Sequence, residues 1–332
     1  KKFTLSFWLK KSSQGTDQFV FNTTTDANNR SQVEFNTDDE MNFICKVSGT
    51  NIGRLRTTRK FTDPSAFYHF VAVLDTTEST SSNRMKLYVN GVQETSFGTE
   101  TYPSQNADAD VSGTHTVGSY YNGSSASNYL DGLLTHVHFT DGYAYQASTF
   151  GSSDPTSGIW KPNTAPSVTY GTNGFFLKFE NSGNLDLDSS SNAHTFSTTG
   201  TLTQNIDTPS NNFATLNPAF AGGGSTTLTN GALTYSLSNY SYNARSTLGF
   251  SKGKWYWEQK QSDTSTRIGL ITSGYTNDLD TDNVNAYYGG SGGGGVYLLL
   301  SASGTSWQRT NNNTSRSVDT YTNASASSAG DI

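Results

Sequence analysis

The stretch Tyr129-Leu-Asp-Gly-Leu-Leu-Thr-His-Val-His-Phe-Thr-Asp-Gly142 decides the fold class of this chain. Its odd-numbered positions include Leu133, Thr135, Val137 and Phe139. Its even-numbered positions include Leu134, His136, His138 and Thr140. A period of two is typical of a β-strand with one dry face and one wet face. Asp-Gly dipeptides at both ends of the stretch are typical of turns. We therefore predict a strand here that closes a β-sandwich.

Two histidines, His136 and His138, fall on the polar parity of this strand. Neutral imidazole is a common metal ligand, so a pair at spacing i, i+2 raises the question of a metal site. The sequence offers no third ligand to join them, whereas a solvated outer face needs none. We expect the solvated face and keep the metal site as the alternative.

The composition indicates a polar chain that still folds. Of its 332 residues, 33% are hydrophobic, 14% are charged and 13% are aromatic. Disordered chains are poor in aromatic residues, so these values favour Ser-, Thr-, Asn- and Gly-rich loops around apolar strands. The apolar runs are short, which predicts no membrane insertion. The single cysteine, Cys45, lies among apolar residues and is expected to be buried.

The charge distribution argues against a nucleic-acid partner. The net charge is −6, and nucleic-acid binding needs a clustered basic face. The local cluster Arg54, Arg56, Arg59 and Lys60 is small, and alternating arginines on a strand are typical of a solvated face.

Strand patterns follow one another along the chain, with polar turns between them. The clearest are residues 3–9, 19–21, 31–35, 41–47, 67–75, 84–89, 92–97 and 114–121. Asn90-Gly91 is a strong hairpin signal, because both central residues of a type I′ turn need positive φ. We predict an all-β chain: an antiparallel jelly-roll β-sandwich over residues 1–180, a polar linker over 181–225, and a second, incomplete β-sandwich over 226–332.

Four segments carry a family resemblance: Phe3-Thr-Leu-Ser-Phe-Trp-Leu-Lys, Tyr68-His-Phe-Val-Ala-Val-Leu-Asp, Met85-Lys-Leu-Tyr-Val-Asn-Gly and Leu130-Asp-Gly-Leu-Leu-Thr-His-Val-His-Phe. In this order they resemble the laminin-G-like, concanavalin-type lectin sandwich family. In the second unit, Ser251-Lys-Gly-Lys-Trp-Tyr-Trp-Glu, Ile268-Gly-Leu and Gly330-Asp-Ile resemble the first half of a SPRY domain. We expect that domain to be incomplete here, and both ends of the chain to be cuts through a longer polypeptide.

The connection between the two units adds a further resemblance. It contains Trp160-Lys-Pro and Asp207-Thr-Pro-Ser-Asn-Asn-Phe-Ala-Thr-Leu-Asn-Pro218. The whole arrangement resembles structural proteins of marine tailed phages and related viruses, which implies a tail fibre, head fibre or adhesin on the virion surface. The implied partners are a host-surface polysaccharide or glycoprotein and other virion proteins. Fibre proteins are commonly homotrimers, although no heptad pattern supports a trimer here.

Glycan binding is the function that we expect, at the loop before the closing strand. Sugar sites combine aromatic faces with groups that hydrogen-bond hydroxyls, on loops over a rigid sandwich. The candidate residues are Tyr120, Tyr121, Asn122, Asn128 and Tyr129, with Tyr102 near them. The alternative is that these tyrosines pack against the sheet edge and keep their hydroxyls in water.

The family resemblance also implies a calcium ion at the rim of the sandwich, in the oxygen-rich shell that this ion prefers. By position in the chain, the candidate ligands are Asp75, Asp131, Asp108 and Asp110. The alternative for each aspartate is a turn or a cap.

The acidic residues do not indicate an enzyme. Glycoside hydrolysis needs two carboxylates about 5 to 9.5 Å apart, and no strand carries acids at i, i+2 and i+4. Asp38-Asp39-Glu40 is contiguous and indicates a turn, and Asp186 and Asp188 lie in the polar connector, where we expect them to be solvated. No Gly-x-Ser-x-Gly elbow and no P-loop is present.

Two functions therefore stand. The first is a non-enzymatic virion adhesin that binds host-surface glycans. The second is a capsid or tail decoration protein that makes protein contacts only. A polysaccharide depolymerase ranks behind both.

Overall fold

The computed structural model describes residues 1–109, 111–220, 226–237, 244–258, 260, 267–271, 295–299, 307–311 and 315–319. The chain divides into two compact units. The first unit consists of Lys1–Ala219 and Leu228–Thr234, and the second consists of Phe220–Thr227 and Tyr235–Ile332. Each unit is described by itself.

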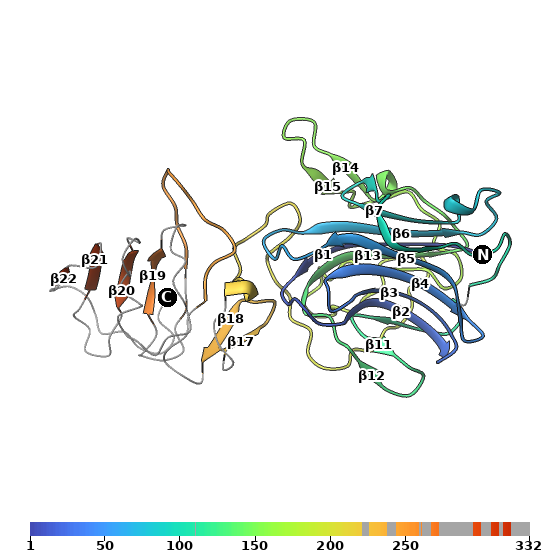
Figure 1. Cartoon of the computed structure of the whole chain (residues 1–332), viewed down its shortest axis with the longest axis horizontal. Helices are drawn as coiled ribbons and strands as arrows, with labels where there is room; N and C mark the ends of the chain where they lie inside the picture. Colours follow the sequence, from blue (N-terminus) through green and yellow to red (C-terminus); the bar gives the residue numbers. More distant parts are fainter. Residues whose placement is uncertain are drawn as a thin grey trace. The chain divides into compact units, whose positions relative to one another are not determined.

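The first unit is a sandwich of two six-stranded antiparallel sheets (Figure 1). Sheet A has the order β16-β13-β1-β6-β7-β8, and sheet B has the order β10-β2-β3-β4-β5-β9. Sheet A consists of β1 (Lys2–Lys11), β6 (Tyr68–Asp75), β7 (Met85–Val89), β8 (Val92–Gln93), β13 (Gly132–Asp141) and β16 (Phe175–Leu177). Sheet B consists of β2 (Gln18–Asp26), β3 (Asn29–Phe35), β4 (Glu40–Val47), β5 (Thr50–Lys60), β9 (Phe97–Thr101) and β10 (Thr114–Val117). The predicted antiparallel jelly-roll sandwich is confirmed.

Short elements decorate this sandwich. Two small hairpins pair β11 (Tyr120–Tyr121) with β12 (Ala126–Ser127) and β14 (Gly151–Ser153) with β15 (Trp160–Pro162). The 3-10 helices are η1 (Ser81–Asn83), η2 (Ala147–Thr149) and η3 (Pro218–Phe220). No helix in the described part of the chain has the length and apolar character needed to cross a membrane.

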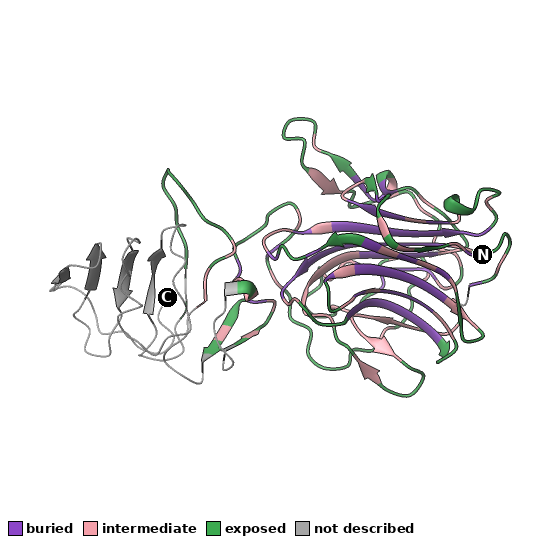
Figure 2. Cartoon of the chain, viewed as in Figure 1, coloured by how far each residue is buried: buried purple, intermediate pink, exposed green. Residues whose placement is uncertain are grey.

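The core lies between the two sheets, where strand alternation places the aromatic residues (Figure 2). In β1 the odd-numbered residues Phe3, Leu5, Phe7 and Leu9 belong to this core, as their parity predicts. Phe3 packs edge-on against Phe43 of sheet B, with ring centroids 5.7 Å apart. Full burial of such a side chain contributes roughly 1.5–3 kcal/mol. Cys45 is also buried in this core, and burial raises the pKa of its thiol to about 12.

A β-bulge interrupts the strand that closes the sandwich. Ser6 of β1 pairs with His138, but Trp8 pairs with Thr135, so β13 has one extra residue at this point. His136 occupies the left-handed region with φ 49°, which lets the strand absorb that residue. The single parity predicted for β13 is therefore wrong before the bulge: Leu134, opposite Leu9, packs against the core, and Leu133 lies opposite Lys10.

The predicted hairpin at Asn90-Gly91 is confirmed. Asn90 has φ 49° and Gly91 has φ 82°, as the turn between β7 and β8 requires. A Cβ atom on Gly91 would lie 2.6 Å from the ring of Trp160. Glycine is thus needed here both for its backbone and for the close approach of that indole.

Most of the segment predicted as a linker belongs to the first unit. Residues 181–219 lie within that unit, and Asp207 is among its buried residues. The ammonium of Lys10, which is 1% exposed, donates to Asp207 Oδ2 at 2.8 Å, to Asn212 Oδ1 at 2.9 Å and to the Phe213 carbonyl at 2.6 Å. A buried cation with three acceptors fixes this segment on the end of β1. The polar composition of this segment does not indicate that it packs on the sandwich, because Lys10, which anchors it, is distant in the sequence.

In the second unit, β17 (Thr226–Thr229) pairs with β18 (Thr234–Leu237), although β17 and β18 each extend across the unit boundary. The strands β19 (Arg267–Ile271), β20 (Gly295–Leu299), β21 (Trp307–Asn311) and β22 (Ser315–Asp319) form an antiparallel sheet in that order. The terminal Gly330-Asp-Ile of the SPRY-like pattern lies outside the described residues. The SPRY resemblance stays a prediction.

The Lys10–Asp207 pair should matter strongly for stability. We expect Lys10→Met to lower the free energy of unfolding by about 3–5 kcal/mol, because it leaves a buried carboxylate unpaired. Urea unfolding measures this. Lys60→Met is the matched control, since Lys60 and Asp38 form an exposed ion pair at 3.2 Å. Loss of this pair should lower the free energy of unfolding by at most about 1 kcal/mol. Equal losses in the two variants would contradict the anchoring role.

Candidate functional site

The two histidines of β13 do not lie on a solvated face. His138 is 1% exposed, and its ring stacks on Phe176 with centroids 3.8 Å apart. Its Nδ1 is 3.0 Å from the hydroxyl of Tyr170, and Phe150 packs on another side of the ring. His136 is half-buried. The expectation of a solvated outer face is wrong, because residues after β13 fold back over this side of sheet A.

A third histidine, His69 of β6, lies on the same side of sheet A and has hydrogen bonds of its own. The indole N–H of Trp160 donates to His69 Nδ1 at 3.0 Å. Nε2 therefore carries the proton and donates to Ser6 Oγ at 2.9 Å. Both ring nitrogens are used and His69 is fully buried, so this ring has a structural role. Within the described residues, no three His, Cys, Asp or Glu side chains are grouped so that they could hold a metal ion.

These histidines should make the protein sensitive to acid. Burial lowers the pKa of His138 well below its usual value, with repulsion from His136, His69 and Lys178 adding to it, and burial lowers that of His69 to about 3. The unfolded chain, with histidine pKa near 6.5, then binds more protons than the folded one as the pH falls below about 6.5, and stability is lost.

The measurement is urea unfolding of wild type and His138→Phe at pH 8 and pH 5. The stability of wild type relative to the variant should fall by about 2 kcal/mol between these two pH values. The same difference at both pH values would mean that His138 is protonated equally in the folded and unfolded states.

The outer side of sheet B is different, because polar groups dominate it. Its side chains alternate with the core residues of β2 to β5, and the strand register places them in two rows. One row is Phe19, Glu34, Asn42 and Arg56; the other is Asn22, Gln32, Ile44 and Arg54. We call these eight residues together with Arg30 the polar face. It lies on rigid strands, which is where binding groups are held most accurately.

Two amide side chains of the polar face are buried and incompletely bonded. Asn42 is 1% exposed, and its Nδ2 has no hydrogen-bond partner, although its Oδ1 accepts from Arg54. Asn22 is fully buried, and its Oδ1 has no partner, although its Nδ2 donates to the Tyr121 carbonyl at 2.8 Å. Buried polar groups without partners cost free energy, so each such atom marks a place for a water molecule or a ligand.

The carboxyl group of Glu34 lies between these amides. Burial raises its pKa to about 7, and the nearby charge of Asp17 adds to the shift, while Arg54 and Arg30 oppose it. Gln32 Nε2 donates to Glu34 Oε2 at 2.9 Å. Around neutral pH this carboxyl group therefore exchanges a proton, and it can both donate and accept hydrogen bonds.

The raised pKa of Glu34 makes the stability depend on pH in the opposite direction to that of the histidines. The folded state holds this proton more tightly than the unfolded state, so the stabilisation is present at low pH and is lost as the pH rises through about 7. From pH 5 to pH 9, wild type should lose about 2 kcal/mol relative to Glu34→Gln in urea unfolding. A constant difference between the two proteins would place the Glu34 carboxyl group in water.

The predicted aromatic loop borders the polar face. Figure 1 shows β11 and β12 as a hairpin beside β2. The Tyr120 ring lies 4.8 Å from that of Phe19, and the Arg30 guanidinium lies 5.6 Å from the Tyr120 ring centroid. Thr24 Oγ1 donates to the Tyr121 carbonyl at 2.8 Å and helps to fix the hairpin on β2. Both tyrosines are half-buried, so both the ligand role and the packing role have support.

The structure brings together only part of the predicted glycan set. Asn122 and Asn128 are exposed, and Asn122 Oδ1 accepts from the backbone of Ser124 and Ser125, as in a turn. Tyr129 is 59% exposed. Tyr102 does not lie near them. It follows β9, at the edge of sheet B opposite to β10, about 20 Å across the sheet.

The predicted calcium ligands do not form one shell. Asp75 lies beside Lys2 and Asp131 follows the loop beside Lys11, at opposite ends of β1, about 30 Å apart. The Asp75 carboxylate already binds the Lys2 ammonium at 2.9 Å and the Thr77 hydroxyl at 2.6 Å. Asp108 is exposed, and Asp110 lies outside the described residues. As a set these residues do not fit a calcium ion, and calcium in the loop around Asp108 stays a prediction.

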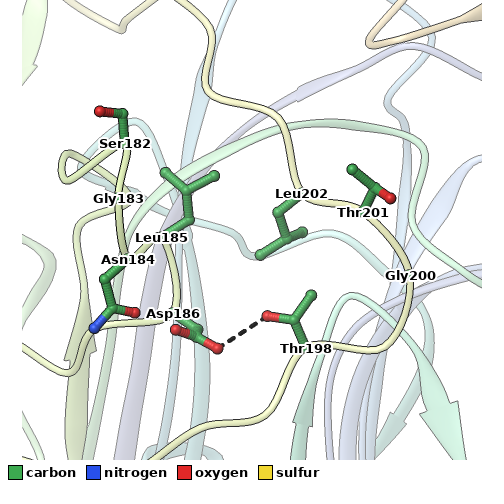
Figure 3. A pocket seen from close by; sticks show the side chains of 9 residues that line it. All are labelled: Ser182, Gly183, Asn184, Leu185, Asp186, Thr198, Gly200, Thr201 and Leu202. Carbon is green, nitrogen blue, oxygen red and sulfur yellow. Dashed lines mark hydrogen bonds between the residues drawn. The ribbon is translucent and has the colours of Figure 1, made fainter.

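A separate pocket of about 320 Å³ lies in the segment after β16 (Figure 3). Its lining is Ser182, Gly183, Asn184, Leu185, Asp186, Thr198, Gly200, Thr201 and Leu202. Thr198 Oγ1 donates to Asp186 Oδ2 at 3.0 Å across it. The expectation that Asp188 is solvated is wrong: it is 4% exposed and accepts from the backbone of Phe176, Ser190 and His194.

The comparisons with known proteins agree with this fold. Residues 1–149 match the model Laminin_G_3, described as the concanavalin A-like lectin/glucanases superfamily. That match covers the strands from β1 through most of the sandwich. No curated protein matches the sequence.

Several solved structures are similar at low identity. A native heptameric SAP-like pentraxin from Limulus polyphemus shares 16% identity with a TM-score of 0.35, covering 49% of this chain and 80% of that one. The Ruminococcus gnavus IT-sialidase CBM40 bound to alpha2,3 sialyllactose shares 12% with a TM-score of 0.29, covering 40% and 71%. The binding domain of Botulinum neurotoxin DC with rat synaptotagmin II shares 11% with a TM-score of 0.27, covering 35% and 27%. At such TM-scores these likenesses carry no argument about function.

Proposed function

We propose that this chain is a non-enzymatic glycan-binding protein and that the polar face of sheet B, bordered by Tyr120, is its binding surface. The observation that carries the proposal is the pair of buried asparagines, Asn22 and Asn42, each with one polar atom that has no partner. One sugar hydroxyl can donate to Asn22 Oδ1 and another can accept from Asn42 Nδ2, since the two amides lie two strands apart. Both atoms are buried, so binding requires the side chains over them to move aside. The match of residues 1–149 to a superfamily of lectins and glucanases supports the same class of ligand.

The aromatic border suits this ligand as well. The Tyr120 ring stands at the edge of the polar face, next to Phe19, and such a ring can cover the apolar side of a pyranose. The central hydrogen-bonding groups come from strands and the aromatic group from a hairpin. The strands hold the hydrogen-bonding groups in place, and the hairpin can adjust the position of the Tyr120 ring.

We also propose that the polar face does not hydrolyse the glycan that it binds. Glu34 is the carboxyl group within the polar face, and hydrolysis requires a second carboxyl group about 5 to 9.5 Å away on the other side of the sugar. The neighbouring Glu40 lies 3.5 Å from the guanidinium of Arg56 and is occupied by that ion pair. Release of reducing sugar from host polysaccharide would contradict this part of the proposal.

The proposed setting is the surface of a virus particle. It rests on the order of segments in the sequence, with a lectin-like sandwich followed by a SPRY-like unit, as in fibre and adhesin proteins of marine tailed phages. The ligand would then be a host-surface polysaccharide or glycoprotein, and the other partners would be virion proteins, with a homotrimer as the expected assembly. Cryo-electron microscopy of particles that contain the chain tests this placement.

A second candidate function is decoration or cementing of a capsid or tail. It is favoured by exposed apolar side chains on one segment: Ile206 is 77% exposed, Leu202 48% and Phe213 39%. Such side chains can pack against other proteins. This function predicts that residues 202–213 are buried against other chains in the particle, while the polar face contacts no host glycan.

The binding surface can be tested by titration calorimetry with host cell-wall polysaccharide. Asn42→Leu keeps the volume of the side chain but removes both the free N–H and the oxygen that holds Arg54, and we expect at least about tenfold weaker binding. Tyr120→Ala should weaken binding by a similar factor. Asp186→Asn, in the pocket near residue 200, is the control and should bind like wild type. Loss of binding in Asp186→Asn alone would move the site to that pocket.

A further inference from the structure

The positive charges of the polar face are a feature that neutral sugars do not explain. We infer that the preferred glycan is anionic and that Arg30 and Arg54 bind its carboxylate or sulfate groups. This inference rests on the proposed function and names its ligand class.

Arg54 is a half-buried cation held by a neutral group. Its Nε and Nη2 both donate to Asn42 Oδ1, at 3.1 and 2.9 Å. The guanidinium has five N–H donors, so this chelation orients the fork and leaves further donors for a ligand. Its partner in this contact is an amide, so the contact does not neutralise its charge.

Arg30 is held in the same way. Its Nε donates to Gln32 Oε1 at 2.7 Å, and its Nη1 donates to the Ala27 carbonyl. The guanidinium also lies over the Tyr120 ring, which stabilises a cation without cancelling its charge. Both partners in these hydrogen bonds are uncharged oxygens.

Arg56 shows the contrast on the same surface. It lies two residues after Arg54 on β5, but its Nε is 3.5 Å from the carboxylate of Glu40. That ion pair neutralises it locally. Arg56 is therefore a matched control: same residue type, same strand, same face, but with a counter-charge of its own.

The nearby acid Glu34 does not offset Arg30 and Arg54 fully. Both arginines act on Glu34, whose pKa of about 7 leaves it roughly half protonated at neutral pH. The two guanidinium groups therefore outweigh this carboxyl group. An anionic ligand that bridges the two arginines restores the balance, and a planar carboxylate or a sulfate ester suits the geometry of the fork.

The spacing of the two arginines suits a saccharide chain. They lie on β3 and β5, with β4 between them, which places their strands about 9.5 Å apart. Ile44 and Lys46 of β4 lie between them, since Lys46 is opposite Arg30 and Ile44 is opposite Arg54. A chain that crosses the strands can thus place charged groups on Arg30 and Arg54, and beyond Arg54 a hydroxyl can reach the neighbouring Asn42.

The test is titration calorimetry of the full chain with paired polysaccharides. One pair is polygalacturonate and its methyl ester, and the other is a sulfated galactan and its desulfated form. We expect at least about tenfold tighter binding of an acidic form than of its neutral counterpart, since charge-assisted hydrogen bonds are the stronger ones. The pair that shows the preference tells whether carboxylate or sulfate is recognised.

The variants assign the preference to residues. Arg54→Gln and Arg30→Gln should lose most of the preference for the acidic form, whereas Arg56→Gln should keep it. Salt should weaken binding of the acidic form in wild type and much less in Arg54→Gln. Circular dichroism confirms that each variant is folded.

The outcomes separate the two proposals. Equal affinity for acidic and neutral forms would overturn the anionic preference and leave glycan binding standing. A preference that survives in Arg54→Gln and Arg30→Gln but is lost in Arg56→Gln would overturn the assignment of residues. No binding of any polysaccharide, acidic or neutral, would overturn this inference together with the proposed function.

Discussion

The two-sided constraint on β1 governs the rest of the first unit. This strand pairs with β6 on one side and β13 on the other, so its register is set along both edges. Odd residues such as Leu5 and Phe7 fill the core, and even residues such as Ser6 and Lys10 reach polar partners beyond the sheet. A slip of one residue would place Lys10 in the aromatic core. The core, the hydrogen bonds of His69 and the anchor for residues 207–213 all depend on this one register.

The outer sides of the two sheets have opposite roles. Sheet A is covered by later segments of the chain, and several of its polar groups have partners there: both ring nitrogens of His69 have partners, and Lys10 has three acceptors, although the buried Trp8 Nε1 has none. On sheet B, Asn22 and Asn42 keep unpartnered atoms, and Glu34 holds a proton near neutral pH. These unpartnered groups are the basis of the ligand site proposed on sheet B, whereas the covered side of sheet A contributes to stability.

How much the sequence could predict depended on the range of the interaction. Local signals succeeded: the alternation in β1 and the Asn90-Gly91 turn are properties of neighbouring residues. The bulge at His136 could not be predicted, because it comes from the pairing of β13 with β1. Burial of His138 and of Asp207 was missed for the same reason, since their partners are far away in the chain.

The candidate site was predicted only in part. Tyr120 and Tyr121 were found from their aromatic loop, but Tyr102 lies at the other edge of the sheet. The polar face was missed, although Arg30, Gln32 and Glu34 at spacing i, i+2 are a visible signal of one shared strand side. Arg54 and Arg56 were interpreted as solvated. Only the pairing of β3, β4 and β5 shows that these residues are neighbours.

Glycan binding by the polar face of sheet B is tested most directly by a nitrogen-15 NMR titration that follows side-chain signals. Host cell-wall polysaccharide is added to the labelled chain while the Asn22 and Asn42 amide signals and the arginine Nε signals are recorded. If glycan binds at the polar face, the signals of Asn42, Asn22 and Arg54 shift together and saturate at one ligand concentration. Saturable shifts confined to residues elsewhere, such as those around Asp186, with the polar-face signals unchanged, would contradict it.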